Sequence, residues 1–267
     1  MMRILICAKD VLDPDAVNAY TVAGRLTLSD DGREIAETAI PRLMNAYDEQ
    51  AIEAALRLRD GGHTVAITVV TVEPRTREHL KRAVALGADE TVLVRVDRPL
   101  DTVGVGRVLA GYAEAFGPFD LVLCGRQASD DDQGVVPAAL AEFLHLPMVE
   151  MARAITIDGQ ELRVVCANAE GDEVVACDLP AVVTITSELG AARYPNAAGV
   201  LRARRSAPSE VTMEQLGIDE KELSPRTELL SLALPQFDSH CEFLSAEDPE
   251  SVARELLARL RSIGILP

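Results

Sequence analysis

The feature that most constrains this chain is an alternation of short apolar runs with helical patterns over its first 145 residues. Continuous apolar runs, typical of strands buried on both faces, occupy residues 3–8, 63–72, 91–96 and 119–125. Segments with helical periodicity occupy residues 47–60, 73–89, 101–116 and 132–145. Strands that alternate with helices of this length predict βαβ units. We therefore expect an α/β fold with a doubly wound, mostly parallel sheet and helices on both faces.

Two regions depart from this alternation. Residues 25–37 alternate around Asp31 and Gly32, which predicts a hairpin inserted after the first strand, and residues 150–186 predict a small antiparallel region. Residues 187–240 lack periodicity, apart from a short helix near 213–216, and a final helix follows at 249–263. So long an aperiodic segment needs a surface to lie on. We expect a domain at residues 1–186 and a long C-terminal arm at residues 187–267.

Charge and hydropathy exclude several classes of partner. The net charge of −17 repels nucleic-acid backbones, so no nucleic acid is expected. The apolar runs are shorter than the roughly 20 residues that span a bilayer, and the N-terminus lacks the pattern of a signal peptide. We expect a cytoplasmic protein without membrane insertion. The five cysteines have no C-x-x-C spacing, which signals neither a disulfide framework nor a zinc site.

The most informative loop is CGRQASDDDQGVVPAALAE, at residues 124–142. A strand ends at Gly125, which permits close backbone approach, and a helix is expected to begin near Asp132 or Gln133. The free amides at such a helix start form an anion site, so the loop is a candidate for binding phosphate. Two alternatives stay open. The aspartates at 130–132 could cap the helix, or they could contribute to a Mg²⁺ site.

No arrangement of catalytic residues is evident. The first strand is not followed by G-x-G-x-x-G, and neither G-x-x-x-x-G-K-[ST] nor G-x-S-x-G is present. The four histidines are scattered along the chain and have no nucleophile beside them. The pattern favours a binding protein over an enzyme, with no catalytic residue and no metal site.

Four stretches, in order, carry a family resemblance. MNAYDEQAIEAALRL (44–58), RAVALGADE (82–90), LVLCGRQASDDD (121–132) and LPAVVTITSELGAARYPN (179–196) are similar to motifs of the β subunit of electron transfer flavoproteins. The chain resembles this family over essentially its whole length. The resemblance implies a fold of the adenine-nucleotide α-hydrolase-like type.

The resemblance also implies a function. The chain would be one half of a heterodimer whose α subunit holds most of a redox-active FAD, and it would pass electrons from flavin dehydrogenases of the acyl-CoA dehydrogenase type to a downstream acceptor. The β subunit of this family buries a further nucleotide, AMP or a second FAD. The alternative is a stand-alone adenine-nucleotide-binding protein of the same fold without flavin.

The resemblance further implies which residues would serve. The nucleotide site would use Cys7, Ala8, Asn45, Ala46, Tyr47, Asp48, Val72, Gly125, Arg126, Gln127, Ala128, Ser129, Asp130, Asp132, Gln133, Gly134, Val135 and Val136. A recognition loop at residues 187–196 would dock the dehydrogenase through Leu189, Arg193 and Tyr194. Leu189 is expected to be an exposed apolar anchor, with packing beneath its own loop as the alternative.

The chain departs from the family pattern at the end of the phosphate loop. Residues 133–137, QGVVP, stand where the family has T-x-Q-[VT]-G, and Pro137 lacks an amide hydrogen. The C-terminal SAEDPESVARELLARL resembles the longer, electron-bifurcating members. The C-terminal resemblance favours FAD over AMP, whereas the altered phosphate loop argues against FAD. Both nucleotides therefore stay open.

Overall fold

The computed structural model describes residues 1–36, 40–234, 241–245 and 248–267. The chain divides into two compact units, Met1–Leu232 and Ala233–Pro267. The first unit extends past residue 186 because segments beyond that position add a strand and helices to it. The functional division at residue 186 stays a prediction.

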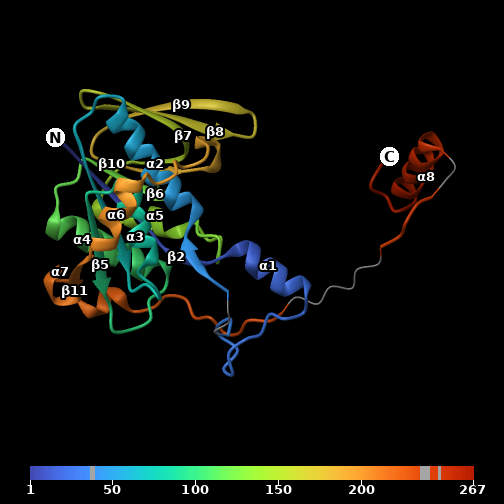
Figure 1. Ribbon diagram of the computed structural model, residues 1–267, viewed down its shortest axis with the longest axis horizontal. Helices are drawn as coiled ribbons and strands as arrows, with labels where there is room; N and C mark the ends of the chain where they lie inside the picture. Colours follow the sequence, from blue (N-terminus) through green and yellow to red (C-terminus); the bar gives the residue numbers. More distant parts are fainter. Residues whose placement is uncertain (37–39, 235–240, 246–247) are drawn as a thin grey trace. The chain divides into compact units, whose positions relative to one another are not determined.

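A nine-stranded sheet organises the first unit, in the order β11-β5-β4-β1-β6-β10-β7-β8-β9 (Figure 1). Parallel pairing joins all strands from β11 to β7, and antiparallel pairing joins β7, β8 and β9. The strands are β1 (Met2–Cys7), β4 (Val65–Val72), β5 (Glu90–Arg95), β6 (Leu121–Gly125), β7 (Met148–Asp158), β8 (Glu161–Asn168), β9 (Gly171–Asp178), β10 (Ala181–Ile185) and β11 (Ser209–Thr212). The predicted mostly parallel sheet is confirmed.

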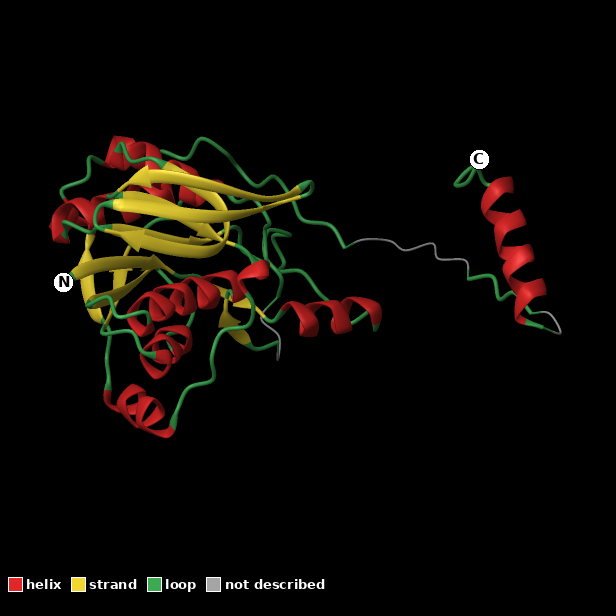
Figure 2. Ribbon diagram, turned by 90° about the horizontal axis from the view of Figure 1, so that it is seen from above, coloured by secondary structure: helices red, strands yellow, loops and turns green. Residues whose placement is uncertain are grey.

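Helices cover both faces of this sheet (Figure 2). On one face, α2 (Ala46–Asp60) and α3 (Glu78–Leu86) bury a cluster that includes Ile4 and Ile6 of β1. On the other face, α4 (Thr102–Phe116) and α5 (Val135–Leu144) pack against a cluster that includes Leu5 and Cys7. Successive residues of β1 point to opposite faces. A strand buried on both faces is therefore apolar at every position, as its sequence predicted.

Several helix boundaries differ from the prediction. Helix α5 begins at Val135, about one turn after the expected start, because Asp132 and Gly134 adopt φ of 51° and 64°. Such left-handed conformations cannot belong to a right-handed helix. Helix α3 begins at Glu78, later than residue 73 where the helical pattern starts, so Pro74 lies in the loop before it.

Some elements were not anticipated. These are α1 (Pro14–Val22), α6 (Ala197–Arg205), and the two-stranded sheet of β2 (Asp10–Leu12) and β3 (Arg42–Met44). The hairpin expected at residues 25–37 is reduced to a turn with one bridge between Leu28 and Ile35, and its last residue lies outside the described part. Strand β10 was expected in an antiparallel hairpin, but it pairs in parallel with β6 and β7.

The arm after residue 187 is only partly aperiodic. Strand β11 extends the main sheet beside β5, and α6 packs on α3. The short predicted helix is present as α7 (Met213–Leu216), between the 3-10 turns η1 (Ser187–Leu189) and η2 (Glu220–Leu223). The second unit contains α8 (Pro249–Ser262), which was predicted and has no buried residue. No helix in the described residues is both long and apolar enough to cross a membrane.

Candidate functional site

A cavity of about 290 Å³ opens at the carboxyl ends of β1 and β6. After β1 the chain builds β4 and β5 on one side of it, and then returns to place β6 on the other side. Ligands of doubly wound sheets bind where the strand order reverses in this way. Its volume is close to the lower limit for small-molecule sites, roughly 300 Å³.

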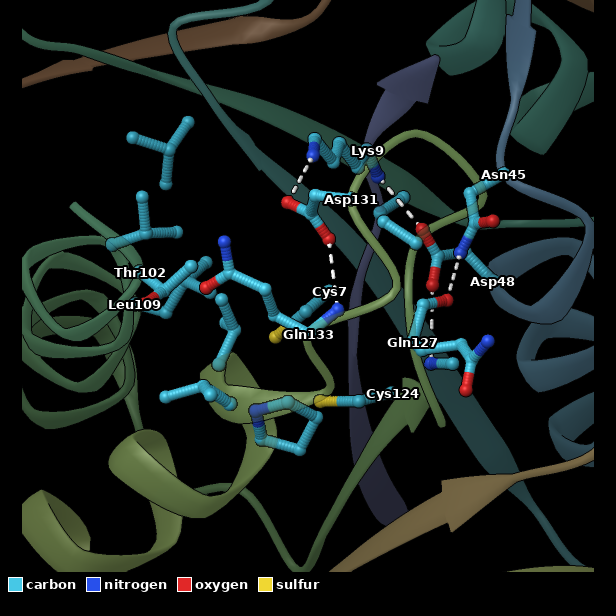
Figure 3. Close-up of a pocket in the computed structure, with 18 of the residues that line it drawn as sticks. Cys7, Lys9, Asn45, Asp48, Thr102, Leu109, Cys124, Gln127, Asp131 and Gln133 are labelled. Carbon is cyan, nitrogen blue, oxygen red and sulfur yellow. Dashed lines mark hydrogen bonds and ion pairs between the residues drawn. The ribbon is translucent and has the colours of Figure 1, made fainter. Parts of the chain in front are cut away.

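The cavity combines an apolar wall with a polar rim (Figure 3). The wall consists of Cys7, Val72, Leu100, Val105, Leu109, Cys124, Val136 and Pro137. The rim includes Lys9, Asp10, Asn45, Asp48, Thr71, Asp101, Thr102, Gln127, Asp131 and Gln133. An apolar wall with a few convergent polar groups is typical of a site for a small organic ligand.

Asp48 joins the loops that follow β1 and β6. Its buried carboxylate accepts hydrogen bonds from the amides of Lys9 (2.8 Å) and Gly125 (3.1 Å). Gly125 has no alternative here, because a Cβ atom would lie 2.3 Å from Asp48 Oδ1. Burial raises the pKa of Asp48 to about 7, although the hydrogen bonds from Lys9, Asn45 and Gly125 act in the opposite direction.

Asn45 holds the candidate phosphate loop against the start of α2. The side chain is 1% exposed and does not cap its own helix. Instead, Nδ2 donates to the carbonyl of Gln127 (2.8 Å), and Oδ1 accepts from the amide of Ser129 (3.3 Å). The loop is therefore fixed at two backbone positions by one side chain.

Lys9 places a cation at the rim of the cavity. Its Nζ contacts Asp130 (2.7 Å) and Asp131 (3.1 Å), as Figure 3 shows for Asp131. Burial alone would lower the pKa of Lys9, but the two carboxylates outweigh it and raise the pKa. Lys9 is therefore charged, and a bound phosphate would compete with the carboxylates for it.

The start of α5 faces the cavity with free amides. Its N-cap is Gly134, which has no side chain, and no side chain caps the helix. The interpretation of the aspartates at 130–132 as caps of this helix is therefore wrong. Val135 and Val136 supply amides at the positive end of the helix, whereas Pro137 supplies none. Within the described residues, no group of three or more His, Cys, Asp or Glu side chains is arranged to hold a metal ion.

The structure brings together most of the residues proposed for the nucleotide site. Those that line the cavity are Cys7, Ala8, Asn45, Asp48, Val72, Gly125, Gln127, Ala128, Gln133, Gly134, Val135 and Val136. Six others lie beside it without lining it: Ala46, Tyr47, Arg126, Ser129, Asp130 and Asp132. For example, the Arg126 guanidinium lies 5.2 Å from the centre of the Tyr47 ring, and Asp132 accepts a hydrogen bond from Gln127 (2.7 Å). Nucleotide binding by these residues stays a prediction.

Sequence reasoning missed the wall that α4 provides. Leu100, Val105 and Leu109 line the cavity from this helix and the loop before it, together with Asp101 and Thr102. Lys9 was also missed, although it directly follows Ala8, which was proposed. The available signal was topological, because α4 follows β5 on the same face of the sheet as α5.

The recognition loop differs from the expectation in one respect. Leu189 is 6% exposed and belongs to the core beneath α2, so the expectation of an exposed anchor is wrong for this residue in this structure. Arg193 is tied to Glu53 and Asp60. Tyr194 is 92% exposed.

Fold and cavity together define a doubly wound α/β protein with a cavity at the point where the strand order reverses, which is where proteins of this class bind their ligands. Comparison with known proteins then gives the family. The model of the electron transfer flavoprotein domain matches residues 33–215. The chain belongs to the electron transfer flavoprotein family and is of the β-subunit type.

Relatives of this type match almost the whole chain. Electron transfer flavoprotein subunit beta of Thermoanaerobacterium thermosaccharolyticum is 30% identical over 99% of this chain and 100% of its own. The protein of the same name from Bacillus subtilis is 32% identical over 88% and 89%. The Caffeyl-CoA reductase-Etf complex subunit CarD of Acetobacterium woodii is 29% identical over 99% and 100%. These matches favour an electron-transfer subunit over a stand-alone nucleotide-binding protein.

Proposed function

We propose that this chain pairs with an α subunit, and that the heterodimer carries electrons from a flavin dehydrogenase to a downstream acceptor through an FAD held mainly by the α subunit. The observation that carries the proposal is the match to β subunits over nearly the full chain, together with a formed cavity at the switch point. In this proposal the chain is a carrier subunit that performs no catalytic step of its own, and it works in the cytoplasm.

We propose that the cavity holds AMP rather than FAD. The α5 start offers two free amides before Pro137, and Lys9 is the only cation among the described cavity residues, which suits one phosphate group. FAD carries a second, nucleotide-sized half besides its AMP part, and a cavity of about 290 Å³ is small for both halves. The aliphatic wall from α4 and α5 would cover the base, and Asn45 and Asp48 would hold the loops that contact the phosphate.

The second unit suits a contact with the α subunit. Helix α8 has an apolar face in which Leu256 and Leu257 are 46% and 43% exposed, and the described residues bury neither of them. An amphipathic helix with an uncovered face of this kind gains stability from a partner surface. Residues 233–267 would therefore pack on the α subunit.

The loop at residues 187–196 is proposed to contact the dehydrogenase, with Tyr194 taking the place of the expected leucine anchor. A nearly fully exposed tyrosine offers both a large apolar surface and a hydroxyl group, and tyrosine is enriched among residues that dominate binding energy. The electron donor in this proposal is of the acyl-CoA dehydrogenase type.

One preparation tests the central claim. The chain is co-expressed with an α subunit of its family, and the purified material is examined by absorption spectroscopy and by mass spectrometry of the released small molecules. We expect a yellow 1:1 complex that contains one FAD and one AMP. A colourless chain that binds no α subunit would overturn the proposed function, whereas two FAD and no AMP would overturn only the assignment of the cavity.

A further inference from the structure

Glu53, in the middle of α2, is a buried carboxylate between two arginines. It is 6% exposed and accepts a hydrogen bond from Arg57 Nε (3.0 Å). It also accepts three hydrogen bonds from Arg193: from the backbone amide (3.2 Å), from Nε (2.7 Å) and from Nη2 (3.2 Å). A planar guanidinium that donates twice to one carboxylate fixes orientation as well as distance.

Further hydrogen bonds beside Glu53 join α2 to the loop at residues 187–196. Arg57 Nη1 donates to the carbonyl of Leu189 (2.9 Å), and Gln50 Nε2 donates to the carbonyl of Gly190 (3.0 Å). Arg193 Nη2 also donates to Asp60 (2.7 Å). Every one of these contacts joins the loop to a side chain of α2, because Gln50, Glu53, Arg57 and Asp60 all belong to that helix. The loop backbone is therefore tied to one helix immediately before Tyr194.

Glu53 stays charged in this environment. Burial alone would raise the pKa of Glu53, but the hydrogen bonds from Arg193 and Arg57 outweigh it and lower the pKa. A buried charge that loses its partners is costly, so the carboxylate and the arginines hold one another in place. Leu189 adds an apolar contact, because its side chain packs in the core beneath α2.

We infer that Glu53 is a positioning residue for partner docking: it holds Arg57 and Arg193 so that the loop presents Tyr194 in one fixed position. This inference rests on the proposed docking role of the loop. A loop that is ordered before binding does not have to be ordered during binding, and this raises affinity without any new contact. Loss of the network should therefore weaken docking and leave electron transfer within the docked complex unchanged.

The test uses Glu53→Gln in the flavin-loaded complex with the α subunit. Glutamine keeps the shape but removes the charge that both arginines need. The control is Glu210→Gln, because Glu210 also accepts from two arginines, Arg77 and Arg95, but it lies on β11, the edge strand of the sheet beside β5, and is more exposed than Glu53. Arg193→Lys is a second variant that keeps the positive charge and loses the two-pronged contact.

Two measurements are made on each variant. Hydrogen exchange of the amides at residues 188–194 should become about tenfold faster in Glu53→Gln and in Arg193→Lys, and should not change in the control. With a purified acyl-CoA dehydrogenase as donor, KM for the complex should rise about five- to tenfold, with kcat and nucleotide content unchanged. Arg193→Lys keeps the test decisive if Glu53→Gln fails to fold.

Two outcomes would overturn the inference: unchanged exchange in folded Glu53→Gln, or faster exchange with an unchanged KM. Tyr194→Ala separates this result from the proposed function. If Tyr194→Ala raises KM while Glu53→Gln does not, the loop docks the dehydrogenase but Glu53 does not position it. If Tyr194→Ala leaves KM unchanged, the docking role itself is wrong, and the inference falls with it.

Discussion

A close contact between Gly125 and Asp48 shapes the cavity at the end of strand β6. The Gly125 amide donates to a buried carboxylate on another element, and the contact leaves no room for a side chain. Gly125 is the last residue of strand β6, so this contact joins the end of the strand to the start of α2.

We expect Gly125→Ala to destabilise the protein by about 2–3 kcal/mol, because its Cβ would lie 2.3 Å from Asp48 Oδ1 and 2.7 Å from Tyr47 Cβ. The same displacement should empty the cavity of nucleotide. Urea denaturation and mass spectrometry of the purified chain measure the two effects. Gly61→Ala is the control, because its nearest atom is 3.3 Å away and its φ is −71°. Equal losses in both variants would contradict the prediction.

His79 is the residue with the least satisfied polar atoms in the described core. It is 2% exposed, and neither ring nitrogen has a hydrogen-bond partner there. Burial lowers the pKa of His79, although the nearby Asp10 carboxylate and the backbone of Thr76 act in the opposite direction, and Arg42 reinforces the lowering. The folded protein therefore favours the neutral ring more than the unfolded chain does.

This pKa shift predicts the direction of a pH effect. The unfolded chain takes up a proton near pH 6.5 and the folded protein does so only at lower pH, so the contribution of His79 to stability is complete above pH 6.5 and falls as the pH drops below it. We expect His79→Leu to remove this loss and to raise stability by about 1 kcal/mol at pH 7.5. Urea midpoints at pH 5.0–7.5 measure both effects. The control is His63→Leu, at a partly exposed position, which should change neither the stability at pH 7.5 nor its pH dependence. A pH dependence of stability in His79→Leu as steep as in the unchanged protein would contradict the prediction.

At the scale of elements, the start of α4 connects the cavity to the C-terminal segment. Asp101 Oδ1 accepts from the amide of Gly104 (2.8 Å) and caps the helix. The second oxygen accepts from the amides of Arg226 (2.5 Å) and Thr227 (3.2 Å). One carboxylate therefore holds a helix that lines the cavity and a segment that is far away in sequence.

We expect Asp101→Ala to cost about 1–2 kcal/mol, as the loss of an N-cap does, and to release residues 226–232 from the domain. Thermal unfolding and limited proteolysis of this segment measure the two effects. Asp101→Asn is the control, since asparagine also caps helices and should retain most of the stability. Protection of the segment in Asp101→Ala would show that other contacts hold it.

At the scale of the whole molecule, the two compact units differ in whether they bury an apolar core of their own. The unit Met1–Leu232 has cores on both faces of its sheet, whereas α8 of the second unit buries none of its residues. The first unit therefore contains the packing that folding requires.

We expect a chain that ends at Leu232 to fold with a free energy of unfolding within about 0.5 kcal/mol of that of the full chain, as measured by urea denaturation, because no described core residue is removed. The same truncation should weaken association with the α subunit, which gel filtration of the mixed subunits would detect. An aggregated or unfolded truncated chain would contradict the first expectation, and undiminished association would contradict the second.

The sequence predicted the alternation of strands and helices over the first 145 residues, the mostly parallel sheet and the loop at residues 124–136 as the candidate site, but it missed α1, α6 and the strands β2, β3 and β11. Local periodicity carries this information, because a strand buried on both faces is apolar at every position and a helix that covers it is apolar at every third or fourth. The sequence did not predict that β11 joins the sheet beside β5 or that β10 lies between β6 and β7, and both became evident from the three-dimensional structure. Pairing between distant segments depends on packing, which no local pattern encodes.

The tertiary structure also decided which residues meet at each site. The wall of the cavity comes partly from α4, Leu189 lies in the core and Tyr194 is exposed, although the two residues belong to the same loop. The start of α5 depends on left-handed backbone at Asp132 and Gly134, where three aspartates alone suggested an earlier helix. A side chain's exposure follows from what packs against it, and for Leu189 that is α2, more than a hundred residues earlier in the chain.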